Sequence, residues 1–281
     1  MGNLGVNAGL GHGFIDFGGA GTVHLMGGAI SLAGVFILGK RKPARDPSVP
    51  PAIPPVHLPM LAVLGLLLWA VGWIAATLAH PLLAGGSVPW SAVALNALAG
   101  MTAGATFSQF YAWFTTGQAD ALMAARGGAA GLVATTAAAP FMPLWSALLV
   151  GAVTGLMVPL LVFLVEEILR FRDPSGALPV SFCGGLIGLL AVGLFASGRF
   201  GAGWNSIGAA SHLGVDGQGV SGLVVAAGAS SDPSQLGAQL LGIGVILALG
   251  LMGGGLLLHF SRYLSSSHTP RQRPAVRDEE E

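Results

Sequence analysis

Seven stretches of mostly apolar residues, each long enough for a membrane-spanning helix, dominate this sequence. They cover approximately residues 19–38, 58–79, 89–115, 120–140, 143–168, 178–197 and 235–260. A helix needs about 20 apolar residues to cross the roughly 30 Å of hydrocarbon in a bilayer. The stretches are too long and too continuously apolar to be the alternating strands of a membrane barrel. The sequence therefore predicts an all-α, polytopic membrane protein with about seven transmembrane helices.

The composition excludes the common soluble classes. Only 9% of the 281 residues are charged and 53% are hydrophobic, whereas soluble domains are roughly 25% charged. Intrinsic disorder requires low hydrophobicity, and a net charge of zero argues against a nucleic-acid partner. The single cysteine, Cys183, excludes a disulfide framework and a cysteine-based metal site. The partner that the composition indicates is the lipid bilayer.

The basic residues are sorted to one side of the predicted helices, and this sorting predicts the orientation of the chain. With seven helices, Arg199 lies on one face and the other basic residues lie on the opposite face. These are Lys40, Arg41, Lys42, Arg45, Arg126, Arg170, Arg172, Arg262, Arg271, Arg273 and Arg277. Because basic loops face the cytoplasm, we expect the N-terminus outside the cytoplasmic membrane and the C-terminus inside. Residues 1–262 form the predicted transmembrane domain, and residues 263–281 form a predicted polar cytoplasmic tail.

Glycine clusters recur within the apolar stretches. Examples are Gly27-Gly28, Gly127-Gly128, Gly184-Gly185 and Gly253-Gly254-Gly255. In a membrane, small residues let helix backbones approach one another closely. The clusters therefore predict a compact bundle rather than loosely associated helices.

Two ionisable residues near the first stretch are candidates for a functional site. His24 lies inside the stretch, in GTVHLMGG, and an ionisable side chain within the membrane indicates a functional site by default. It could line a pore, where a neutral imidazole can bind a small polar solute or pass a proton, or it could be hydrogen-bonded to a neighbouring helix. Asp16 precedes the stretch and could cap the helix or attract cations to a vestibule.

The remaining ionisable and aromatic residues have more ordinary interpretations. His80 and His259 lie at the ends of stretches, and Arg126 could extend its side chain to the membrane interface. No metal-ligand spacing on one face relates the histidines in predicted loops, which are His12, His57, His212 and His268. Interface anchoring explains most of the tryptophans Trp69, Trp73, Trp90, Trp113 and Trp145. With no nucleotide-binding or hydrolytic motif, we expect no enzyme activity, no metal and no cofactor.

The segment GFIDFGGAGTVHLMGGAISLAGVFILGKRK resembles the signature fifth helix of the ammonium transporter family, which includes methylammonium permeases and Rhesus proteins. The resemblance continues through WAVGWIAATL, GGAAGLVATTA, RDPSGALPVSFCGGLIGLLAVGLFA and QLGAQLLGIGVILAL, which are similar to the sixth, eighth, tenth and eleventh helices. It implies a partial ammonium-transporter-like bundle, in which the seven stretches are helices five to eleven of an eleven-helix fold. It also implies a homotrimer whose subunits each have a narrow pore between two inverted halves.

The resemblance assigns pathway roles to particular residues. His24 matches the first of two facing pore histidines, and Asp16 matches the acid near the outer start of the same helix. The second pore histidine falls on Ser181, whose hydroxyl can form hydrogen bonds but does not titrate near neutral pH. The outer-gate phenylalanine falls on Ala76, and a small polar residue of the outer vestibule falls on His80.

Two functions follow from the resemblance; the first is our prediction, and the second is the alternative. The first is transport of ammonium or ammonia across the cytoplasmic membrane, with a homotrimer or a partner chain that supplies helices one to four. The second is a divergent, non-conducting structural or accessory subunit of a membrane complex. The departures from the family pattern at pathway positions favour the second function; they are Ser181, Ala76, His80 and Arg126.

Overall fold

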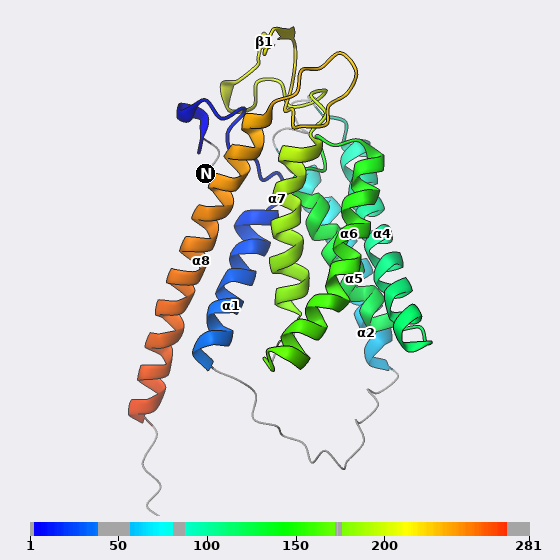
Figure 1. The fold of residues 1–281 in the computed structure, drawn as a ribbon, viewed down its shortest axis with the longest axis vertical. Helices are drawn as coiled ribbons and strands as arrows, with labels where there is room; N and C mark the ends of the chain where they lie inside the picture. The colour runs from blue at the N-terminus through cyan, green and yellow to red at the C-terminus, as the bar shows by residue number, and fades with distance from the viewer. Residues whose placement is uncertain (1–2, 39–56, 81–87, 172, 174–175, 269–281) are drawn as a thin grey trace, which may run out of the picture.

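The computed structural model describes residues 3–38, 57–80, 88–171, 173 and 176–268. These residues form an all-α bundle with irregular segments at one end (Figure 1). A helical segment lies in each of the seven predicted stretches. The helices are α1 (Met26–Leu38), α2 (His57–Leu78), α4 (Trp90–Thr116), α5 (Ala121–Thr136), α6 (Leu144–Phe163), α7 (Cys183–Phe195) and α8 (Pro233–His268).

Three π-helical turns extend these helices. The turn η2 (Ala20–Leu25) leads into α1, η3 (Leu164–Ile168) follows α6, and η4 (Ala177–Phe182) leads into α7. Short 3-10 turns, η1 (Val6–Ala8) and η5 (Trp204–Ser206), lie outside the bundle helices. π-Helical turns inside longer helices are rare and frequently occur at functional sites, so η2 and η4 are candidate locations for a functional site.

Five of the described helical segments are long and apolar enough to cross a membrane. They are Ala20–Ile37, His57–Thr77, Leu144–Ile168, Ala177–Phe195 and Pro233–Leu264. The helix α5 has 16 residues and is about 24 Å long at 1.5 Å per residue, which is shorter than the hydrocarbon layer. The helix α4 is long enough but carries polar residues such as Asn96 and Gln109. Of the seven predicted spanning helices, five therefore have the length and composition of a membrane span within the described residues.

The helix α5 lies at the centre of the bundle and packs against α2, α4, α6 and α7 (Figure 1). Most of its second half is buried, from Ala130 to Thr136. Its surroundings are protein rather than lipid, which explains why a short and only moderately apolar helix is stable there. The neighbouring pair α1 and α8 packs on the other side of α7.

Pairs of glycines four residues apart bring α4, α5 and α6 into backbone contact. The pairs are Gly100 and Gly104, Gly127 and Gly131, and Gly151 and Gly155. A Cβ atom on any of the α5 or α6 members would collide with the backbone of Gly100 or Gly104. This arrangement confirms the prediction of close packing from small residues, because only a residue without a side chain permits such an approach.

The segment between α7 and α8 folds over the end of the bundle that also carries the N-terminal residues (Figure 1). It contains η5 and a small antiparallel hairpin of β1 (Ser211–His212) and β2 (Val215–Asp216), in which Ser211 pairs with Asp216. The N-terminal residues and the end of α8 lie at opposite ends of the bundle (Figure 1). Helix α8 continues to His268, and residues 269–281 of the predicted tail lie outside the described residues.

Candidate pore site

The first candidate element is the start of η2, which Asp16 caps. The carboxylate of Asp16 accepts hydrogen bonds from the backbone N–H groups of Gly21 (3.1 Å) and Thr22 (2.8 Å) and from the Thr22 hydroxyl (2.9 Å). Gly19 precedes the helix with φ of 87°, a left-handed conformation that favours glycine. A carboxylate at this position satisfies free N–H groups and interacts favourably with the helix dipole. His24 follows as the fifth residue of the π turn.

The start of η4 is built in the same way. The carboxylate of Asp173 accepts hydrogen bonds from the backbone N–H groups of Ala177 (2.9 Å) and Leu178 (2.8 Å). Gly176 precedes this turn with φ of 67°, again in the left-handed region. Ser181 is the fifth residue of this six-residue π turn, as His24 is of the other. His24 and Ser181 therefore occupy equivalent positions in two similarly capped helices.

Two glycines let these helices cross at close range. A Cβ atom on Gly28 would lie 2.6 Å from the Cα of Phe182, and one on Gly185 would lie 2.7 Å from the backbone nitrogen of Leu25. Gly28 lies four residues after His24 and meets Phe182, which directly follows Ser181. In the same way, Gly185 lies four residues after Ser181 and meets Leu25, which directly follows His24. The helices run in opposite directions through the bundle (Figure 1). The contacts are thus related by an approximate two-fold axis, with His24 and Ser181 beside the crossing.

The surroundings of His24 are aromatic on one side and uncovered on another. The ring of Trp69 from α2 meets the His24 imidazole edge to face, with 5.7 Å between the ring centroids. The neighbouring Val23 is 63% exposed, and Ala76 on α2 is also exposed. Within the described residues, η2 with His24 therefore packs against η4 and against Trp69 of α2, and the exposed Val23 beside His24 marks an apolar face that no described residue covers.

His80 lies at the end of the bundle that carries the N-terminal residues. Its ring packs on Phe17 at 4.4 Å and stacks on Trp204 at 6.2 Å, with 10° between the latter two planes. Trp204 in turn contacts Phe141 edge to face at 5.6 Å. Partial burial lowers the pKa of the His80 imidazole below its ordinary value. His80 therefore belongs to an aromatic cluster that joins α2 to the segment between α7 and α8.

Arg126 lies on α5, near the start of η4. Its Nε is 3.6 Å from the position that a Cβ atom would take on Gly176, next to the start of η4. The side chain is half-buried. The structure thus places Asp16, His24, Ser181 and Arg126 at or beside the two capped turns. Ala76 lies on an exposed side of α2, and His80 directly follows that helix.

The tryptophans divide into two groups, and the prediction that interface anchoring explains most of them fits three of the five. Trp90, Trp113 and Trp145 lie near helix ends and are more than half exposed, as interface anchors would be. Trp73 is buried against Gly18, and Trp69 packs on His24. These two belong to the surroundings of the candidate site, and their spacing of four residues on α2 places both on one face.

A polar cluster was missed because its members are far apart in the sequence. The rings of His12 and His212 are in contact, with centroids 4.7 Å apart, and Asp232 binds His212. His12 and His212 lie in different predicted loops, so no spacing in the sequence indicates the contact. His57 and His268 also differ from the prediction, because they are the first residue of α2 and the last of α8. Among the described residues, no group of three His, Cys, Asp or Glu side chains could hold a metal ion.

Comparison with known proteins now decides the family. Residues 2–264 match the model of the Ammonium Transporter Family. The chain belongs to this family. Among similar ammonium transporter family members, Ammonium transporter Amt2 of Archaeoglobus fulgidus is 34% identical over 196 residues, which are 70% of this chain and 42% of that protein. Ammonium transporter Amt1 of Haloferax mediterranei is 35% identical over 208 residues, 70% of this chain and 40% of that protein.

Solved structures of ammonium transporter family members have the same fold. Mep2 of Saccharomyces cerevisiae superposes with a TM-score of 0.69 at 26% identity, covering 96% of this chain and 56% of that one. A protein described as a Sensor Amt Protein superposes with a TM-score of 0.68 at 26% identity, covering 90% and 56%. The chain thus spans about two fifths of these curated relatives and just over half of these structures. The partial resemblance predicted from the sequence is confirmed.

Proposed function

We propose that this chain takes part in transport of ammonium or ammonia across the cytoplasmic membrane, with its N-terminus outside and its C-terminus in the cytoplasm. The observation that carries the proposal is the crossing of two similarly capped helices, which places His24 and Ser181 at equivalent positions. Membership of the ammonium transporter family supports the substrate class. The names of the similar proteins, which include ammonium transporters, support it as well.

In this proposal each residue of the site has a limited role. The neutral imidazole of His24 accepts or donates one hydrogen bond to a small solute as it passes, and it can hold a proton for a short time. Asp16 positions η2, because its carboxylate already binds three donors of that turn. The Ser181 hydroxyl offers a hydrogen bond but no titration near neutral pH. Proton transfer would therefore depend on His24 and not on a pair of histidines.

The proposal requires further helices over the uncovered face. The exposed Val23 lies on this face, so the face would let lipid reach the site in the absence of a cover. We propose that a partner chain or a further part of the assembly supplies these helices, and that the assembly is a homotrimer of such complete units. The chain offers glycine-rich helix surfaces there, and small residues favour close contact between helices in a membrane.

Uptake into liposomes tests the proposal. Liposomes would contain the full chain together with the membrane proteins that copurify with it, and an internal dye would report pH after an ammonium pulse. We expect uptake above that of empty liposomes. Replacing His24 with Ala should slow uptake at least about tenfold, because it removes a positioned proton-binding group. The matched control is His259→Ala, an exposed histidine on α8, which should leave uptake unchanged.

The outcomes separate the two functions. Absence of uptake above empty liposomes would refute transport and would leave the non-conducting structural or accessory subunit as the function. That alternative is favoured by a specific observation, since the position equivalent to His24 holds Ser181 and the predicted gate position holds the exposed Ala76. Uptake that is insensitive to His24→Ala would refute the proposed site while keeping transport.

A further inference from the structure

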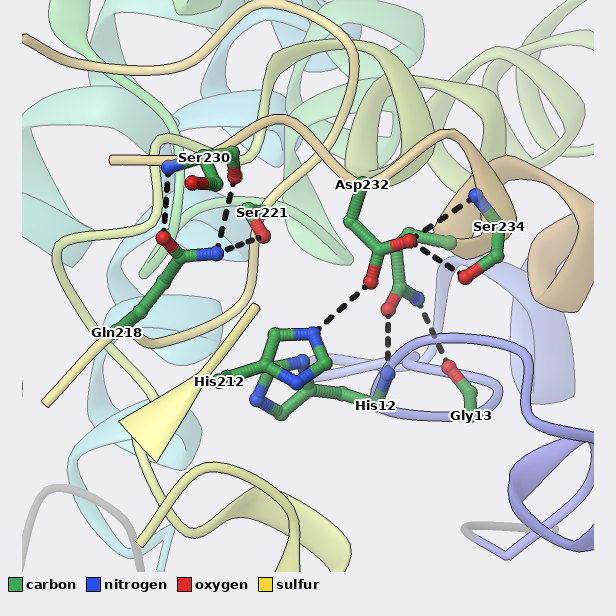
Figure 2. A network of polar contacts seen from close by, with 9 residues as sticks. His12, Gly13, His212, Gln218, Ser221, Ser230, Asp232 and Ser234 are labelled. Carbon is green, nitrogen blue, oxygen red and sulfur yellow. Dashed lines mark hydrogen bonds and ion pairs between the residues drawn. The ribbon is translucent and has the colours of Figure 1, made fainter. Parts of the chain in front are cut away.

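A cluster of titratable residues lies outside the candidate pore site, where the N-terminal residues meet β1 and the start of α8 (Figure 2). The His212 Nε2 lies 3.0 Å from the Asp232 Oδ2, and the His12 ring meets the His212 ring at 68°. Asp232 also accepts hydrogen bonds from the backbone N–H and the hydroxyl of Ser234 through its other oxygen. Three segments that are distant in the sequence therefore converge on one point.

The segment that contains His12 leads directly to the candidate site. Residues 11–19, here called the leading segment, contain Asp16 and end directly before Ala20, the first residue of η2. Two glutamines one turn apart on α8 bind this segment along its length. Gln235 accepts a hydrogen bond from the His12 backbone N–H (2.9 Å) and donates to the Gly13 carbonyl (2.8 Å), and Gln239 donates to the Ile15 carbonyl (3.1 Å).

A second attachment joins the leading segment to the segment between α7 and α8. The Asn205 side-chain amide donates to the carbonyl of His12 at 2.7 Å. Together with the contact between the His12 and His212 rings, this bond makes His12 the residue at which the leading segment meets both neighbouring elements. Displacing His12 would therefore break the contacts to β1, to η5 and to the start of α8 at once.

The environment of His12 strongly favours the neutral imidazole. The side chain is fully buried, and neither ring nitrogen makes a hydrogen bond of ordinary geometry. Burial and, next in size, the adjacent His212 lower the pKa of His12 to about 4, although Asp232 and the Ile207 backbone act in the opposite direction. His212 from β1 and Asp232 from the start of α8 are the titratable groups among the described residues that act on it.

We propose that His12, His212 and Asp232 form an acid-sensitive clasp, which holds the leading segment against β1 and α8 and releases it when the surrounding medium is acidified. Protonated His12 cannot stay in a buried position beside a second imidazole without a partner for its charge. It therefore moves into water, and the leading segment moves with it. This inference goes beyond the proposed function and does not depend on transport.

The direction and range of the effect follow from the two pKa values of His12. In the released segment the imidazole has its ordinary pKa of 6.5, and in the closed clasp its pKa is about 4. The released state thus binds the proton more readily, and the closed state is fully favoured only above pH 6.5. As the pH decreases from 6.5 to about 4, the ratio of closed to released molecules falls about tenfold for each pH unit, or about 300-fold in total.

Hydrogen exchange of the full chain in lipid nanodiscs tests the clasp between pH 7.5 and 3.5. The reporters are the backbone N–H groups of His12 and Phe14, which bind Gln235 and the Leu4 carbonyl. After correction for the intrinsic exchange rates, we expect their protection to fall about 300-fold as the pH decreases. His12→Phe should abolish the fall, while the control His259→Phe, an exposed histidine on α8, should retain it.

Two further variants decide the matter if His12→Phe does not fold. His212→Phe removes the neighbouring imidazole, so it should raise the pKa of His12 in the closed clasp toward 6.5 and make the total fall in protection smaller than in the wild type. Asp232→Asn removes the neighbouring negative charge, so it should lower that pKa and make the fall larger. Opposite changes in the size of the fall support the clasp. Protection that is independent of pH in the wild type, a fall that persists in His12→Phe, or changes in the same direction in both variants would overturn it.

Discussion

The contact between α4 and α6 makes a sharp prediction about a single methyl group. Gly151 on α6 is buried against Gly100 on α4, and an added Cβ would lie 2.7 Å from the Cα and 2.9 Å from the carbonyl carbon of Gly100. It would also collide with the carbonyl oxygen of Gly100. These are all backbone atoms, so no side-chain rotation can relieve the collision. Gly151→Ala must therefore push the two helices apart.

The magnitude follows from two opposing effects. Alanine favours the helix over glycine by about 1 kcal/mol, whereas overpacking a close contact costs about 1–3 kcal/mol. Because three backbone atoms are involved, we take the upper value and expect a net loss of about 2 kcal/mol. The matched control is Gly244→Ala on α8, where an added Cβ meets nothing within 4 Å. This control should gain up to about 1 kcal/mol from the same change in helix propensity.

Thermal unfolding of both variants in one detergent provides the measurement. Both variants gain the same helix propensity, so the difference between their unfolding free energies, about 3 kcal/mol, reports the cost of overpacking. At about 2–4 °C per kcal/mol for a chain of this size, the unfolding midpoints should differ by about 6–12 °C. If Gly151→Ala were as stable as Gly244→Ala, the close approach of α4 and α6 would be refuted.

Two other substitutions address polar contacts in the bundle. Asn96 on α4 donates hydrogen bonds to the carbonyls of Ala139 (2.9 Å) and Met142 (2.8 Å). Asn96→Leu leaves both acceptors unsatisfied and should therefore cost about 1–3 kcal/mol of unfolding free energy. An unchanged unfolding midpoint would contradict this prediction. Asp173→Ala removes the cap of η4 and should cost about 1–2 kcal/mol. It should also speed hydrogen exchange at Ala177, and unaltered exchange there would argue against the cap.

The helices were largely predictable because hydropathy is a local property of the chain. The predicted stretches 58–79 and 89–115 correspond to α2 (His57–Leu78) and α4 (Trp90–Thr116) to within a residue or two at each end. Only helices satisfy their own backbone hydrogen bonds in lipid, so a long apolar stretch leaves few alternatives. The length and hydropathy of the stretch 120–140 could not reveal that α5 lies inside the bundle, because the burial of α5 depends on neighbours from four other helices.

The candidate site was predictable only in part. His24 is visible in the sequence as an ionisable residue in an apolar stretch, and Asp16 as an acid before a helix. The equivalent positions of His24 and Ser181 depend on π turns, which have no sequence signal of their own, and on a crossing at Gly28 and Gly185. The glycine clusters predict a close approach there but not which two helices meet. The packing of Trp69 on His24 likewise depends on which face of α2 turns inward.

The sequence by itself determined that this chain forms apolar helices, and it indicated the family and the cap at Asp16. These properties depend on residues close together in the chain, where hydropathy and local hydrogen bonding act. The tertiary structure alone decided which distant residues meet: Gly151 with Gly100, and His12 with His212 and Asp232. The physical reason is that each of these contacts depends on how separate helices and loops pack, and packing fixes burial, charge environment and close approach together.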